Sequence, residues 1–89
     1  MAKCLTEKGV RFFGTYTCPW CIKQKEIFGE ASKYLTYIEC AGDRATEEEL
    51  ALCQEFNIAG VPDWRFPDGT QQPGMQTIQR LAELSACPL

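Results

Sequence analysis

A Cys-Pro-Trp-Cys motif at residues 18–21 constrains the fold of this chain more than any other feature, because it lies between two contrasting patterns. Before it, residues Val10 to Gly14 are β-branched and aromatic and end in glycine, which predicts a short buried strand. After it, apolar residues recur with the spacing of an amphipathic helix, and Pro19 suits the first position of that helix. The motif is therefore predicted at the N-terminal end of a helix that follows a buried strand.

The rest of the chain predicts a single α/β domain over residues 1–89, with a small mixed four-stranded sheet and helices on both faces. The strands on either side of the first long helix are expected to pair in parallel, as in a βαβ unit. A Thr-x-x-Glu capping box begins the next helix, and a Pro-Asp-Gly turn joins two antiparallel strands. The other predicted elements are a helical segment from Ala2 to Lys8, strands from Thr36 to Cys40, from Trp64 to Phe66 and from Thr70 onward, and a helix from Ile78 to Ser85.

Two of the predicted helices have an apolar face. The helix from Pro19 has an apolar stripe of Ile27, Phe28, Ala31, Tyr34 and Leu35, and a kink or a tight contact is expected at Gly29. The helix capped by Thr46 ends near Asn57, with Leu50, Cys53 and Phe56 facing inward.

The composition excludes several kinds of function. The chain has no histidine, which removes Cys-His and Ser-His nucleophilic pairs and histidine metal ligands. Its net charge of -3 argues against nucleic-acid binding, which requires clustered lysine and arginine. No apolar run approaches the roughly 18 residues of a membrane span, and the N-terminus lacks the apolar stretch of a secretory signal. We therefore expect a soluble domain without a signal peptide of its own.

The two cysteines of the motif are expected to carry thiol-disulfide chemistry. Unpaired N–H groups and the dipole at a helix N-terminus favour an anion, so Cys18 is the predicted nucleophilic thiolate. Cys21, one turn further on and more buried, is the predicted resolving thiol that releases the partner. A zinc knuckle would need a second close cysteine pair or histidines. A permanent structural disulfide is also not expected, because a bridge that closes so short a loop at a helix start is usually labile. We therefore predict neither a metal nor a cofactor.

The run Phe12–Cys21, followed about forty residues later by Gly60-Val61-Pro62, resembles the thioredoxin superfamily. The resemblance implies a thioredoxin-like fold, in which the proline of the later loop is cis and faces the cysteine pair. Pro62 occupies that position, and a cis Val61-Pro62 bond would turn the Val61 backbone toward Cys18, where an extended substrate segment can pair with it. Trp20 is expected to be exposed beside the site.

A narrower resemblance comes from Gln24–Gly29, Tyr37–Cys40 and Cys53, which are similar to the thioredoxin-like domain fused to bacterial and plant vitamin K epoxide reductase homologues. It implies an extracytoplasmic domain, in a periplasm or lumen, that oxidises protein thiols. Electrons would pass to a membrane-embedded, quinone-reducing partner of that reductase type, in cis or in trans. It also implies a disulfide between Cys40 and Cys53, for which two buried free thiols are the alternative.

Several residues leave alternatives open. Cys4 and Cys87 match no motif and are free, bridged to each other, or used between molecules. Phe12 stands where reductases of the superfamily carry a buried aspartate, and Asp63 stands where threonine is common, either near the site or facing solvent. Tyr16, Val61 and Trp64 join Trp20 as apolar surroundings of Cys18, with core or rim positions as the alternative for Tyr16 and Trp64. Lys23 and Lys25 are interpreted as a solvated helix face.

Two other functions compete with the oxidase. One is a cytosolic disulfide reductase of the glutaredoxin or thioredoxin type, although the Gly-Gly-Asp segment with which glutaredoxins hold glutathione is not visible after Pro62. The other is a redox-inert docking domain that keeps the fold and holds partners with the Pro62 loop. The intact cysteine pair argues against such a domain.

Overall fold

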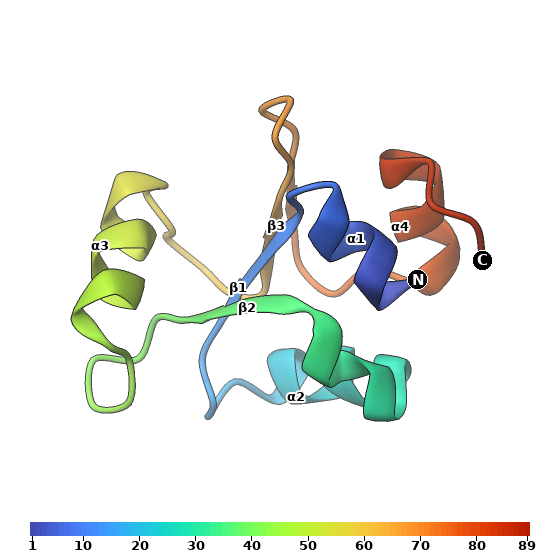
Figure 1. Cartoon of the computed structure of the whole chain (residues 1–89). Coiled ribbons are helices and arrows are strands. Elements are labelled where there is room, and N and C mark those ends of the chain that lie inside the picture. The colour runs from blue at the N-terminus through green and yellow to red at the C-terminus, as the bar shows by residue number, and fades with distance from the viewer.

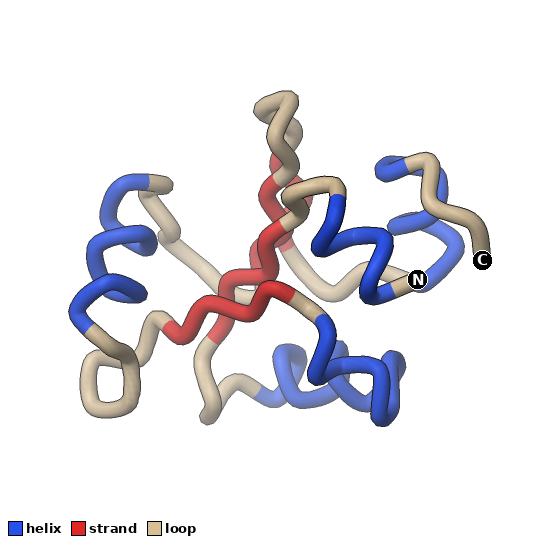
Figure 2. Tube along the Cα trace, in the orientation of Figure 1, coloured by secondary structure: helices blue, strands red, loops and turns tan.

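A central four-stranded sheet organises the chain, as Figure 2 shows in red, and the computed structural model describes all 89 residues. None of its helices has the length and apolar character that crossing a membrane requires. The elements are, in order, α1 (Ala2–Glu7), β1 (Arg11–Gly14), α2 (Pro19–Phe28), the 3-10 helix η1 (Gly29–Tyr34), β2 (Thr36–Glu39), α3 (Glu47–Glu55), β3 (Asp63–Arg65), β4 (Gln71–Pro73) and α4 (Ile78–Ser85).

The strands are ordered β2-β1-β3-β4. β1 and β2 are parallel and place Phe12 beside Tyr37, as in a βαβ unit whose crossover contains α2. β3 runs antiparallel to β1, and β4 runs antiparallel to β3. This order and these directions are those of the thioredoxin-like fold, so the predicted fold class is confirmed.

Helices cover both faces of the sheet, and Figure 1 shows α3 on one side with α1 and α4 on the other. On the α3 side, Phe13 packs against Phe56 with 5.4 Å between ring centroids. On the other side, Phe12 stacks on Trp64 at 4.8 Å. This second face carries the main core, which consists of Ala2, Leu5, Val10, Phe12, Cys21, Phe28, Trp64, Phe66, Leu81 and Cys87.

The helix predicted from Pro19 to Leu35 is divided in the structure. Its α-helical part ends before Gly29, whose φ of 57° is a left-handed value that glycine adopts without steric cost. The chain continues as η1, so of the two alternatives predicted at Gly29 the structure shows the break in the helix. The tight contact is absent, because nothing lies within 4 Å of a Cβ added there. The change of helix type also breaks the apolar stripe. Ile27 and Tyr34 are 38% and 43% exposed instead of buried.

Helix α3 begins as predicted, with the Thr46 side chain bonded to the Glu49 N–H and the Glu49 carboxylate bonded back to the Thr46 N–H. Its inward face is only half-buried, and no residue of the helix is fully covered. Helix α3 is therefore held against the sheet by a few side-chain contacts and by the disulfide between Cys53 and Cys40, the residue after β2.

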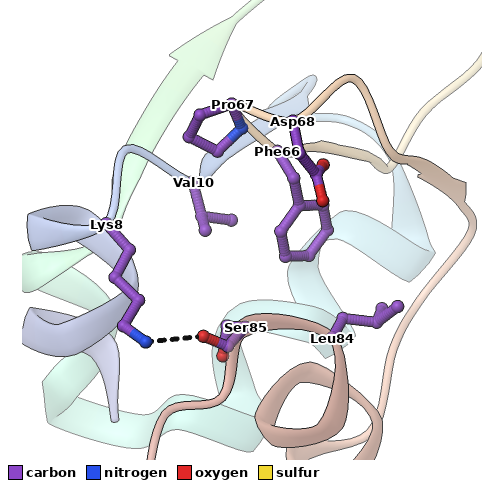
Figure 3. A pocket seen from close by; sticks show the side chains of 7 residues that line it. All are labelled: Lys8, Val10, Phe66, Pro67, Asp68, Leu84 and Ser85. Atoms are coloured by element: carbon purple, nitrogen blue, oxygen red, sulfur yellow. Dashed lines mark hydrogen bonds between the residues drawn. The ribbon is translucent and has the colours of Figure 1, made fainter.

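The two ends of the chain lie side by side and are joined by a disulfide between Cys4 in α1 and Cys87 after α4. Lys8 Nζ also donates a hydrogen bond to the Ser85 carbonyl at 2.8 Å (Figure 3). An open cavity of about 200 Å³ lies beside this contact, between α1, α4 and the β3–β4 turn. Its lining residues are Lys8, Val10, Phe66, Pro67, Asp68, Leu84 and Ser85.

Candidate active site

Cys18 is the N-cap of α2, and Pro19 fills the first helical position. The Cys18 sulfur accepts a hydrogen bond from the Cys21 N–H at 3.2 Å. The side chain is half-exposed, whereas Cys21 is only 1% exposed. The roles stay predictions, and this difference in exposure is what they require, because an attacking sulfur must be reachable and a resolving sulfur needs only to reach its neighbour.

The Val61-Pro62 loop lies directly against Cys18. The peptide bond between the two residues is cis, and the Cys18 thiol lies 3.7 Å from the Val61 carbonyl oxygen. Pro62 is buried, and its carbonyl accepts a hydrogen bond from the Gly74 N–H at 2.7 Å, which anchors the loop to the end of β4. Trp20, two residues after Cys18, is 61% exposed.

Cys21 points into the protein beneath the helix start. Burial, and then its hydrogen bond with Cys18, raise the pKa of the Cys21 thiol to about 12, while the charge of Lys25 lowers it. Space for the sulfur exists because Gly14 has no side chain. A Cβ added there would stand 3.0 Å from Cys21 Sγ and 3.1 Å from Cε1 of Tyr37. Because its pKa is raised so far, the Cys21 thiol is protonated at neutral pH.

Behind Cys21 lies a polar pair that the sequence reasoning missed. The Tyr37 hydroxyl donates to Glu39 Oε1 at 2.9 Å, and burial, followed by this bond, raises the pKa of the phenol. Glu39 is 8% exposed, and its other oxygen accepts from the N–H groups of Tyr16 and Ala41. The signal was in the alternation of the second strand, whose residues 37 and 39 lie beside Phe12 and Gly14.

Lys25 belongs to the same cluster. Its Nζ lies 3.6 Å from the centroid of the Tyr37 ring, so the prediction that it is part of a solvated face is wrong. Lys25 lies one helical turn after Cys21 on α2, so the side chain that reaches the Tyr37 ring comes from the same helix as the buried thiol. Lys23, by contrast, is exposed as predicted.

The other residues expected around Cys18 divide between the site and the core. Tyr16 is half-buried, and its hydroxyl bonds to Asp43, which ties the loop before Cys18 to the loop after β2. Trp64 is only 1% exposed and belongs to the core, which is the alternative left open for it. Asp63 is buried on the opposite face of β3 and forms an ion pair with Arg65 at 3.1 Å, so it faces neither Cys18 nor solvent.

The remaining four cysteines are paired. Cys40 and Cys53 form the disulfide that the resemblance implies, with their Cα atoms 5.9 Å apart. Cys4 and Cys87 form the second, which decides among the three alternatives left open for them. Cys18 and Cys21 are thus the two free cysteines.

No protein-family model matches the chain. The whole chain aligns with part of the thiol-disulfide oxidoreductase LTO1 of Arabidopsis thaliana, at 35% identity over 92 residues. The chain spans 24% of the length of that relative.

Proposed function

We propose that this thioredoxin-like domain, similar along its whole length to part of a thiol-disulfide oxidoreductase, is itself a protein thiol-disulfide oxidoreductase and works as a dithiol oxidase. The observation that carries the proposal is the state of its six cysteines. Four are committed to disulfides, and the two free ones stand together at a helix N-terminus beside the Val61 carbonyl. Thiol-disulfide exchange needs this combination of a reachable nucleophile and a protected second thiol.

The reaction begins with the Cys18–Cys21 pair oxidised. A substrate thiolate attacks Cys18 Sγ, the bond between the two cysteines breaks, and Cys21 leaves with the electron pair and takes up a proton. A second substrate thiolate then attacks the substrate sulfur of the mixed disulfide, and Cys18 leaves as a thiolate. The helix N-terminus and the Cys21 N–H, 3.2 Å from Cys18 Sγ, stabilise that charge. The substrate loses two electrons, which now reside on the reduced cysteine pair.

The substrate is a protein segment in extended conformation. The Val61 backbone lies next to Cys18, with 3.7 Å between the carbonyl oxygen and the thiol, and a strand-like segment can form main-chain hydrogen bonds there without a specific sequence. Trp20, with 61% of its surface exposed, offers an apolar contact to the same segment. Such a site suits many unfolded or partly folded proteins instead of one partner.

The working location is extracytoplasmic, and the electrons pass to a membrane-embedded, quinone-reducing partner of the vitamin K epoxide reductase type, in cis or in trans. Two structural disulfides, Cys4–Cys87 and Cys40–Cys53, in so small a domain favour an oxidising compartment. Phe12, which is fully buried where superfamily reductases carry an aspartate, argues against a reductase. The partner completes the cycle by accepting two electrons from Cys18 and Cys21 through a second exchange.

The test is the redox state of each cysteine across a series of glutathione buffers, read by alkylation and mass mapping. An oxidase requires the Cys18–Cys21 couple to titrate above about -200 mV while Cys40–Cys53 remains bridged throughout. A couple near about -270 mV with Cys40 and Cys53 reduced would establish the cytosolic reductase instead. A Cys18→Ser variant that oxidised substrate thiols as well as the parent would establish the docking domain.

A further inference from the structure

Cys21 needs a proton partner in either direction of exchange. As an attacking group it must lose its proton, and as a leaving group it must gain one. The position where superfamily reductases hold an aspartate for this purpose is occupied by Phe12, a fully buried hydrocarbon. Burial also removes Cys21 from water, which is the usual alternative. A side chain other than an aspartate must therefore exchange the proton with Cys21.

We infer that the Tyr37 hydroxyl and the Glu39 carboxylate form a proton relay for Cys21. This inference rests on the proposed exchange function and adds the residues that move its proton. The tyrosine ring and the Cys21 sulfur close over the same glycine, at 3.1 and 3.0 Å from the place where a Gly14 Cβ would be. The contacting ring atom is Cε1, which is bonded to the carbon that carries the hydroxyl.

The relay continues from the phenol to the Glu39 carboxylate. The Tyr37 hydroxyl donates to Glu39 Oε1 at 2.9 Å, so its own oxygen is left free to accept. Glu39 Oε2 is held by the N–H groups of Tyr16 and Ala41 at 3.2 and 3.0 Å. These bonds fix the carboxylate at the end of β2, where β2 gives way to the loop that leads to α3.

The proton balance is complete within this chain. When Cys21 attacks Cys18 in a mixed disulfide, a sulfur–sulfur bond forms between them and the partner leaves with its electron pair. The Cys21 proton passes to the Tyr37 oxygen as the tyrosine gives its own proton to Glu39. In the oxidase direction each transfer is reversed. Tyr37 remains neutral before and after, which suits a phenol whose pKa burial raises.

The charged groups around the relay support this direction of transfer. From α2, Lys25 lies over the Tyr37 ring at 3.6 Å and favours negative charge on Cys21. From α3, the Glu49 carboxylate accepts the Glu39 backbone N–H at 2.9 Å. Asp43 and Arg44 are engaged with Tyr16. Once Cys18 is part of a mixed disulfide, its hydrogen bond and charge no longer oppose deprotonation of Cys21, so only burial remains to be overcome.

The test mixes the reduced active-site dithiol with dithiobis(nitrobenzoate), a disulfide whose released thiolate absorbs visible light, in a stopped-flow instrument. The first thiolate released reports attack by Cys18, and the second reports resolution by Cys21. In the Tyr37→Phe variant we expect the first phase to be unchanged and the second to slow by about a hundredfold, the usual contribution of a positioned proton acceptor. The rate of the second phase should then rise about tenfold per pH unit across neutral pH.

Tyr34→Phe is the matched control, because it removes the hydroxyl of an exposed tyrosine and should leave both phases as they are. Glu39→Gln should slow the second phase like Tyr37→Phe, and if it fails to fold the tyrosine variant alone decides. A second phase in Tyr37→Phe with the parent rate and pH dependence would overturn the relay while leaving the exchange function intact. A parent protein that released only one thiolate, with no Cys18–Cys21 bond formed, would instead refute the proposed function.

Discussion

Gly14 decides how closely Cys21 and Tyr37 approach each other. An alanine Cβ at this position would lie 3.0 Å from the cysteine sulfur and 3.1 Å from the ring, closer than ordinary van der Waals contact. We expect Gly14→Ala to lower the free energy of unfolding by about 1–3 kcal/mol and to slow resolution by Cys21. Gly42→Ala is the control, since nothing lies within 4 Å of its added Cβ. Equal urea midpoints for the two variants would contradict the prediction.

The Cys21 thiol should titrate at a higher pH in the folded protein than in the unfolded chain. Because burial raises the pKa of Cys21 to about 12 from a reference value of 9.0, the folded protein keeps this proton at a pH where the unfolded chain has lost it. The contribution of Cys21 to stability is therefore full below about pH 9 and declines as pH rises toward 12.

Alkylation followed by mass mapping checks this directly. In the reduced, folded domain we expect the alkylation rate of Cys21 to increase about tenfold per pH unit beyond pH 9. In denaturant the alkylation rate should level off near that pH. A plateau at the same pH in both states would show that the thiol is not protected by the fold.

At the scale of elements, Gln24 connects helix α2 to β3 and to the segment before α4. It is fully buried, and its side-chain amide accepts from Trp64 Nε1 at 3.1 Å and from the Gln76 N–H at 2.7 Å, and donates to the Gln76 carbonyl at 2.9 Å. The bond to Trp64 holds the helix that carries Cys21 against β3, and the two bonds to Gln76 hold it to the segment before α4.

Replacing this amide by a hydrocarbon should be costly. We expect Gln24→Leu to lower the free energy of unfolding by about 3 kcal/mol, because the indole N–H and both backbone groups of Gln76 lose their partner. Gln79→Leu, an exposed position on α4, should change it by less than about 0.5 kcal/mol. Chemical denaturation of both variants measures the difference, and a small loss at Gln24 would mean that water replaces the amide.

Elements marked by local patterns were predicted, and contacts between elements were not. The strand, the motif and the helix from Pro19 follow from neighbouring residues, as does the Thr46 capping box. The Tyr37–Glu39 pair was missed because its position depends on the register between β1 and β2. Gln24 was missed because a polar residue in a helix is usually exposed. The early end of α2 depends on the backbone angle that Gly29 adopts.

At the scale of the whole molecule, the two disulfides close loops of very different length. Cys4–Cys87 spans 83 positions and Cys40–Cys53 spans 13. In the chain-entropy model they contribute about 4.5 and about 3 kcal/mol, because a longer loop restricts the unfolded chain more. Sequence patterns cannot identify the longer pairing, since no local spacing relates residues at opposite ends of a chain.

Paired substitutions to alanine test this difference without leaving an odd thiol. The Cys4→Ala/Cys87→Ala variant should lose more stability in urea than the Cys40→Ala/Cys53→Ala variant, and the reactivity of Cys18 should persist in both. The prediction would be wrong if the shorter loop proved the more costly to open. Loss of Cys18 reactivity in the first variant would show that the terminal bridge also shapes the site.

The bridge between α1 and the segment after α4 also determines how the domain responds to tension. Residues 4–87, which include every helix and strand after the first turn of α1, lie within the covalent loop that it closes. A pulling force applied through the backbone on the two sides therefore passes through the sulfur–sulfur bond and not through the sheet. With the bridge intact the domain lengthens by a few residues at most under load. Once it is reduced, the polypeptide can be drawn out except for the short loop that Cys40–Cys53 closes, so the extensibility of the domain is under redox control.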